Sequence, residues 1–214
     1  MDLIITIFSL IVLLFSVIIH ELAHGSMAYS LGDPTAKYAG RLSLNPLKHL
    51  DPFGSVILPL LLFISGSPIL VGWAKPVPVN PYNFKDQKWG TLKVSIVGPA
   101  TNFIIAIIFS LFVRLLSMSQ QLPFLLPQQS AFFMELLSIV AIYNFLWGFF
   151  NLVPIPPLDG SWILFRFLPQ RFERVKMFIQ QYGLFLLIFF IFFGGLQGLS
   201  AMSQFFYYLI AGIL

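Results

Sequence analysis

Residues 3–29 read LIITIFSLIVLLFSVIIHELAHGSMAY. About 20 consecutive apolar residues are enough to cross a bilayer as a helix, so this stretch predicts a membrane-spanning helix. Its C-terminal part nevertheless contains His20, Glu21 and His24. Ionisable side chains are costly inside a bilayer and mark functional positions there. We therefore expect this first helix to carry a functional site as well as to anchor the chain.

The spacing of these three residues is that of a metal site. Residues four apart lie on one face of a helix, so His20 and His24 can reach the same ion, with Glu21 beside them. This is the H-E-x-x-H arrangement, in which two imidazoles bind Zn²⁺ and the Glu takes a proton from metal-bound water. The chain has no Cys, so any further ligand must be His, Asp or Glu. The motif predicts metal-dependent peptide hydrolysis within the membrane.

The composition is that of an integral membrane protein. Hydrophobic residues make up 58% of the chain and charged residues 9%, whereas soluble domains contain about 25% charged residues. We expect one integral-membrane domain over residues 1–214, with a catalytic core near residues 1–170 and C-terminal membrane segments in residues 178–214. The net charge of +4 does not indicate nucleic-acid binding, because the basic residues lie between apolar segments. The N-terminal run is too long for a signal peptide and lacks a basic n-region, so we expect it to be retained.

Further apolar segments predict an all-α polytopic membrane protein with about five to six transmembrane helices. These segments cover residues 53–72, 92–117, 132–153 and 178–214. The last segment is long enough for one long helix or for two helices with a turn at Gly194 and Gly195. We expect two helices there.

The basic residues predict the orientation, because short cytoplasmic loops are enriched in Lys and Arg. Residues 115–144 contain neither. We therefore expect a multi-pass plasma-membrane protein with its N-terminus outside and its site toward the cytoplasmic side. The two basic groups are Lys37, Arg41, Lys48, Lys75, Lys85, Lys88 and Lys93 before or at the third apolar segment, and Arg166, Arg171, Arg174 and Lys176 after the fourth.

The segment 53–72 has basic residues on both sides, which a full crossing would place on opposite faces of the membrane. A re-entrant or β-hairpin element keeps both flanks on one face. Pro59, Gly66 and Pro68 interrupt the segment, and broken backbone is tolerated at membrane depth where protein or a cavity surrounds it. The alternative is a spanning helix with a proline kink; we favour re-entry.

The third metal ligand has few candidates among the eight acidic residues. Asp159 follows the fourth apolar segment at its cytoplasmic end, which is the depth of His20 and His24. It lies in NLVPIPPLDG, residues 151–160, which the prolines make extended and stiff. The alternative is that Asp159 is a turn residue or a helix N-cap before Gly160. We expect Asp159 to be the ligand.

Together these residues resemble the site-2 protease family of intramembrane zinc metalloproteases. The matched pieces are HELAH at residues 20–24, Gly98-Pro-Ala-Thr-Asn102, and Asn151-x-x-Pro154 through Leu158-Asp159-Gly160. Residues 45–54 and 72–80 look like the compact prokaryotic branch of that family, without the PDZ insertion or the nucleotide-sensing domain of other members. The resemblance covers about residues 1–170.

The resemblance implies a membrane-embedded zinc metalloendopeptidase with one Zn²⁺ held by His20, His24 and Asp159, and with Glu21 as the catalytic acid–base group. The implied substrates are single-pass transmembrane proteins, cleaved within the membrane in regulated intramembrane proteolysis or in the clearance of membrane remnants. The implied surroundings are the lipid bilayer and, for control, a regulatory membrane partner or a homo-oligomer.

Other residues have open alternatives. The resemblance implies that Asn151 stabilises the oxyanion of the attacked carbonyl, whereas taken alone Asn151 can cap the fourth helix. Asn102, in the third helix, either lines the site or hydrogen-bonds between helices. His49 is an ordinary loop residue by default, or it lies near the route to the metal. Residues 40–45 and 77–80 can form extended edges that pair with an unwound substrate.

Two other functions fit parts of this pattern. A metal transporter also places His and acidic residues in a membrane, but it needs ligands along a path through the bilayer, and the candidates here share one depth. A non-catalytic scaffold with this fold would be expected to lack Glu21 or Asp159, and both are present. We therefore favour the protease.

Overall fold

The regular elements of this computed structural model are helices, and the structure describes residues 2–57, 60–61, 64–65, 74–118 and 127–213. The long helices are α1 (Asp2–Ser30), α4 (Gly90–Met118), α5 (Pro127–Leu152), α7 (Glu173–Phe192) and α8 (Gly195–Ala211). The short ones are α2 (Thr35–Tyr38), η1 (Pro46–Lys48), η2 (Pro52–Ile57), η3 (Pro81–Asn83), α6 (Asp159–Phe167) and η4 (Gln170–Phe172). The expectation of an all-α protein is confirmed for the described residues.

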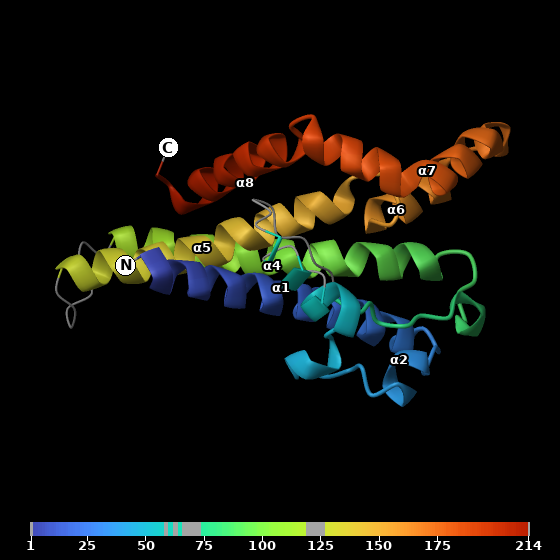
Figure 1. Cartoon of the computed structure of the whole chain (residues 1–214), viewed down its shortest axis with the longest axis horizontal. Helices are drawn as coiled ribbons and strands as arrows, with labels where there is room; N and C mark the ends of the chain where they lie inside the picture. The colour runs from blue at the N-terminus through green and yellow to red at the C-terminus, as the bar shows by residue number, and fades with distance from the viewer. Residues whose placement is uncertain (1, 58–59, 62–63, 66–73, 119–126, 214) are drawn as a thin grey trace.

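Three helices form the centre of the molecule. Figure 1 shows α1, α4 and α5 running side by side along its length, with α8 against the α4–α5 pair. A buried cluster holds α4, α5 and α8 together, and its members are Ala106, Val113, Ala141, Phe145, Tyr207 and Ala211. Small residues let helix backbones approach closely, which is how helices associate in a membrane where apolar burial alone does not drive them together. The bundle therefore gives α1 rigid neighbours along its length.

In the part of the chain that the structure describes, four helical stretches are long and apolar enough to cross a membrane: residues 3–30, 90–118, 128–152 and 170–192. The C-terminal tail is divided into α7 and α8, which agrees with the expected two helices. In Figure 1 these two helices follow one another along the molecule, and α8 ends on the side where α1 begins. The expected total of five to six spans stays a prediction.

The residues that flank the segment 53–72 lie together. Leu50 and Ala74 form an antiparallel bridge, and the Lys75 N–H donates to the His49 carbonyl at 2.9 Å. The chain therefore leaves and returns at one place, which agrees with re-entry. Much of the stretch between lies outside the described residues, so the re-entrant or β-hairpin element itself stays a prediction.

Asp33 ties two loops together beside the end of α1. Its carboxylate is fully buried and accepts hydrogen bonds from the Asn80 N–H at 2.7 Å, from the Asn83 amide at 2.8 Å, and from the N–H and hydroxyl of Thr35. Residues 74–80, AKPVPVN, which we call the proline-rich segment, are held in this way against the loop that follows α1. This attachment fixes the segment next to Glu21.

Candidate metal centre

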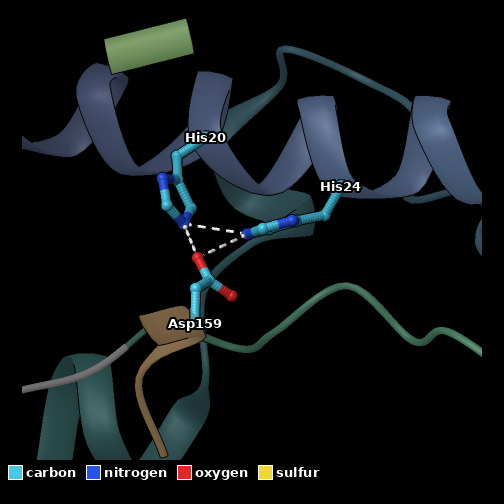
Figure 2. Close-up of side chains that lie close together, drawn as sticks. All are labelled: His20, His24 and Asp159. Carbon is cyan, nitrogen blue, oxygen red and sulfur yellow. Dashed lines mark hydrogen bonds and ion pairs between the residues drawn. The ribbon is translucent and has the colours of Figure 1, made fainter. Parts of the chain in front are cut away.

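Three candidate ligands converge at the junction of α1 and α6. His20 and His24 project from the same face of α1, and Asp159 faces them from the first residue of α6 (Figure 2). Asp159 Oδ2 lies 3.0 Å from His20 Nε2 and 3.1 Å from His24 Nε2, and the two Nε2 atoms are 2.9 Å apart. Both imidazoles are buried. The structure thus brings together the three residues that the sequence predicts as ligands.

The hydrogen bonds of His24 fix which nitrogen faces the centre. Its Nδ1 lies 2.7 Å from the Val94 carbonyl oxygen on α4. A carbonyl can only accept, so Nδ1 carries the hydrogen and Nε2 of the neutral ring presents a lone pair. His24 is therefore in the tautomer that a metal ligand needs.

His20 is held in the same tautomer by Asn102. His20 Nδ1 lies 2.7 Å from Asn102 Oδ1, while the Asn102 amide nitrogen donates to Asn144 Oδ1 at 2.9 Å and to the Ser16 carbonyl at 3.3 Å. Since Asn102 donates through its nitrogen, its oxygen accepts from His20 Nδ1. Asn102 therefore does both things that the sequence left open: it bonds between helices and it orients a ligand.

The geometry fits a zinc ion. Two imidazole lone pairs and a carboxylate oxygen point at one another within 3.1 Å, an arrangement that is repulsive unless a cation lies between them. Tetrahedral Zn²⁺ with bonds of about 2.0–2.1 Å spaces its ligand atoms by about 3.3 Å, close to what is seen here. Three protein ligands leave one position free, as in catalytic rather than structural zinc sites.

Gly98 makes room for the centre on α4. A Cβ at this position would lie 2.5 Å from His24 Nε2 and 2.6 Å from His20 Cε1, well inside contact distance. Only glycine lets α4 pass this close to both imidazoles. The close packing of α4 on the two imidazoles is thus a physical reason for the glycine in the motif Gly98-Pro-Ala-Thr-Asn102.

Asp159 reaches the centre because α6 begins there. The structure assigns the N-cap position of α6 to Leu158, with no side-chain capping bond, so the N-cap alternative for Asp159 is wrong. Residues 152–158 lead from the end of α5 to this point. The loop thus carries Asp159 back to the face of α1 that holds the histidines.

Glu21 is bound by the proline-rich segment. Its Oε2 accepts the Val77 N–H at 2.7 Å, and the side chain is half-buried next to the ligands in sequence. The Val77 amide is therefore engaged by the protein itself. Any substrate strand that pairs with residues 77–80, as the sequence suggests, has to use other main-chain groups.

Asn151 and His49 form hydrogen bonds with main-chain carbonyls and not with the three candidate ligands. The Asn151 amide donates to the Trp147 carbonyl one turn earlier in α5, at 3.0 Å. His49 is 1% exposed, and its Nε2 lies 2.7 Å from the Ser43 carbonyl. Within the described residues neither belongs to the cluster of potential metal ligands. Both interpretations of His49 stay predictions.

Sequence reasoning missed two residues beside the centre. Asn144 on α5 holds Asn102, and the ring of Trp147 stands edge-on to His20 with 6.5 Å between centroids. The signal for Asn144 was present, since a polar amide inside an apolar helix needs a partner. Trp147 gave no such signal, because most membrane tryptophans only pack or lie at the interface.

A buried His-His-Asp cluster inside a bundle of apolar helices, with a Glu next to the first His, defines a membrane metalloprotease. The chain belongs to peptidase family M50, the site-2 protease family, whose family model matches residues 8–190. Zinc is the metal of this family and of the relatives described next.

The chain is 40% identical over 182 residues to "Putative zinc metalloprotease YwhC" of Bacillus subtilis, a match that covers 84% of this chain and 78% of that protein. It is 29% identical over 184 residues to "Putative zinc metalloprotease Rip2" of Mycolicibacterium smegmatis, covering 82% of this chain and 62% of the relative. The Rip2 protein of Mycobacterium tuberculosis H37Rv is 32% identical over 181 residues, covering 83% and 64%. The chain thus spans less than two thirds of the two mycobacterial proteins. No solved structure matches the chain.

Proposed function

We propose that this protein is a zinc-dependent intramembrane endopeptidase that cleaves the transmembrane segments of single-pass membrane proteins. The observation that carries the proposal is the position of the ligand cluster. His20, His24 and Asp159 are enclosed by α1, α4 and α6, inside a bundle whose helices are long and apolar enough to cross a membrane. This position supports a substrate peptide bond that comes from within the membrane or from its edge.

The residues of the centre have separate tasks in hydrolysis. His20, His24 and Asp159 hold the zinc ion, which when bound supplies a Lewis acid that activates water near neutral pH. Glu21 accepts the proton of the attacking water and delivers it to the leaving amine. Asn102 and the Val94 carbonyl keep the two imidazoles in the ligand tautomer. The surrounding helices exclude bulk water from the reacting bond.

Asn151 is the proposed donor to the substrate carbonyl as negative charge develops on its oxygen. A side-chain amide carries two hydrogens, and the structure shows one bond, to the Trp147 carbonyl. The second hydrogen remains for the substrate. Replacing Asn151 by Asp should then lower turnover while zinc content stays near that of the wild type.

The basic residues support a location in the plasma membrane with the centre toward the cytoplasm. Apart from Arg114, they lie in the loops after α1, at the start of α4, and in α6, η4 and the start of α7, and Figure 1 shows these elements toward the end of the molecule where α7 begins. Short basic loops stay in the cytoplasm. A regulatory membrane partner or a second copy of the chain would act on this arrangement from the lipid-facing side.

Cleavage of tagged transmembrane substrates by the purified full chain tests the proposal, with Glu21→Gln as the comparison and zinc measured on both. We expect the wild type to cut within the membrane segment, Glu21→Gln not to cut, and both to hold about one zinc. Equal cleavage by both proteins would rule out Glu21 as the base. Absence of zinc from wild type prepared without chelator and supplied with zinc would rule out the ligand assignment.

A further inference from the structure

We propose that Arg41 is a positioning residue for Glu21 and acts through a single peptide group, the one that joins Pro76 and Val77. The inference rests on the proposed function, in which Glu21 is the proton acceptor. Arg41 lies in the loop that follows α2, outside the H-E-x-x-H motif.

The contacts form a series. Arg41 Nη2 donates to the Pro76 carbonyl at 3.1 Å and to the Lys75 carbonyl at 2.6 Å. The N–H of Val77 donates to Glu21 Oε2 at 2.7 Å. The Pro76 carbonyl and the Val77 N–H belong to the same peptide unit. The peptide group therefore connects the two charges: the Arg41 guanidinium donates to its oxygen, and its N–H donates to the Glu21 carboxylate.

Because Arg41 is buried, these hydrogen bonds matter for the charges of both Arg41 and Glu21. Arg41 is 7% exposed, and among the described residues no carboxylate lies within ion-pair distance of it. A buried charge without compensation is strongly unfavourable. Hydrogen bonds in a chain polarise one another where the local dielectric is low. The guanidinium thus strengthens the bond from Val77 to Glu21, and Glu21 compensates the charge of Arg41 through the peptide.

The sequence of the proline-rich segment makes Val77 the single donor at this point. Pro76 and Pro78 have no N–H and stiffen the chain on both sides. The segment is anchored on either side of Val77, by Lys75 to the His49 carbonyl and by Asn80 to Asp33. Gly25 lets it approach α1, because a Cβ there would lie 2.9 Å from Val77 Cγ1. The Val77 N–H therefore has one orientation, toward Glu21.

A fixed carboxylate matters for turnover more than for binding. Proton transfer needs the base within hydrogen-bond reach of the attacking water, and a misplacement of about 1 Å can cost about 100-fold in rate. Val77 binds one carboxylate oxygen, so the other remains for the proton. Loss of the Arg41 contact should lower kcat and leave KM and zinc content nearly unchanged.

Kinetics on one cleavable substrate test this with the full chain in detergent or nanodiscs. Arg41→Gln and Val77→Pro, which removes the N–H, should each lower kcat about 10- to 100-fold, with KM within about twofold and about one zinc per chain. Val77→Ala keeps the N–H and should retain much more turnover than Val77→Pro. Arg41→Lys keeps a charged donor and should fall between wild type and Arg41→Gln. The control is Arg114→Gln, which removes another arginine that donates to a main-chain carbonyl, at Ile210, and should have no effect.

The double variant gives the sharpest result. If Arg41 acts only through the Pro76–Val77 peptide, Arg41→Gln combined with Val77→Pro should be no slower than the slower single variant. Losses that multiply would overturn the proposal. A raised KM with unchanged kcat would also overturn it, and would show instead that the segment binds substrate.

Hydrogen–deuterium exchange tests the contact without any activity. Only Val77, Val79 and Asn80 carry main-chain amide hydrogens in residues 76–80, so a peptide from this region reports on at most three amides and the change in one of them is measurable. Glu21→Ala and Arg41→Gln should each speed exchange of one amide about tenfold or more, while Glu21→Gln, which keeps an acceptor oxygen, should not. Unchanged exchange in Glu21→Ala would overturn the proposal. If Glu21→Gln cleaves like wild type while the exchange result holds, the proposed function fails and the contact stands.

Discussion

At the residue scale, Asn102 is the clearest outer partner of a ligand. It accepts the hydrogen of His20 Nδ1 and is itself held by Asn144. Outer partners of metal ligands are worth about 10- to 100-fold in metal affinity. Asn102→Ala should therefore weaken zinc binding by about that factor, measured by competition with a chelator of known affinity. Asn102→Asp keeps the acceptor oxygen and should bind zinc more tightly than Asn102→Ala. Equal zinc affinity of wild type and Asn102→Ala would show that Asn102 does not support His20 as a ligand.

Gly98 makes a second prediction at this scale. A methyl group at this position would overlap His24 Nε2 and His20 Cε1, so Gly98→Ala should displace both ligands and leave well under one zinc per chain. The matched control is Gly198→Ala on α8, where a Cβ would meet nothing within 4 Å. That variant should hold zinc normally and gain up to about 1 kcal/mol from better helix propensity. The zinc content of the two purified variants tests this prediction, and a full zinc complement in Gly98→Ala would contradict it.

Asp33 predicts a pH dependence of stability. Burial alone would raise its pKa, but hydrogen bonds from Thr35, Asn80 and Asn83 outweigh burial and hold the pKa below the usual value of an Asp side chain. A lowered folded pKa stabilises the protein above the unfolded pKa, and this stabilisation is lost as the pH falls through the folded value. The Tm advantage of wild type over Asp33→Asn should thus be constant from neutral pH to about pH 5 and shrink below about pH 4. An advantage that does not change with pH would contradict this.

At the element scale, α8 is docked through Tyr207. This side chain is 3% exposed, and its hydroxyl lies 2.5 Å from Ser138 Oγ on α5. Truncation of a large buried aromatic costs about 3–5 kcal/mol, whereas loss of one hydrogen bond costs about 1 kcal/mol. Tyr207→Ala should therefore lower Tm several times more than Tyr207→Phe in thermal unfolding of the detergent-solubilised chain. Similar Tm values for the two would show that α8 does not depend on this contact.

The long helices could be predicted from sequence and the short one that completes the centre could not. Apolar length predicts α1, expected over residues 3–29 and found over Asp2–Ser30, and α4, expected over residues 92–117 and found over Gly90–Met118. Helix α6 has only nine residues and follows the loop of residues 153–158, so no long apolar run predicts it. Asp159 was predicted as a ligand from its depth, and the helix that presents it was not.

The same contrast applies to the site residues. Helical spacing predicts His20 and His24 as a pair, because both lie in one element. The contacts of Glu21 with Val77, and of Arg41 with Pro76, join residues that are distant in sequence and depend on how loops fold over α1. No local pattern contains such contacts. The role of Asn151 and the re-entry of residues 53–72 stay predictions for the same reason.

At the scale of the whole molecule, the metal joins two helices that lie far apart in the sequence. Bound zinc links α1 to α6, and a ligand that binds only the folded state stabilises it by about 2.7 kcal/mol at 100 times its Kd. For a chain of this size that corresponds to a Tm change of about 5–10 °C. A chelator should lower the Tm of wild type by about this amount and should not change the Tm of His24→Ala. A chelator effect of equal size on His24→Ala would show that zinc stabilises the fold elsewhere.

The bridge between Leu50 and Ala74 has a consequence for protein engineering. The chain leaves and returns at one point, because Leu50 pairs with Ala74 and His49 with Lys75. Residues 51–73 can therefore be treated as a cassette, that is, a segment attached to the rest of the chain at two neighbouring positions. The free energy of closing such a loop changes slowly with its length, by about 0.6 kcal/mol for each doubling. Cassettes of different length or composition can therefore be exchanged between relatives without shifting the proline-rich segment. Chimaeras built at these two junctions would test whether this segment influences the choice of substrate while the metal centre stays unchanged.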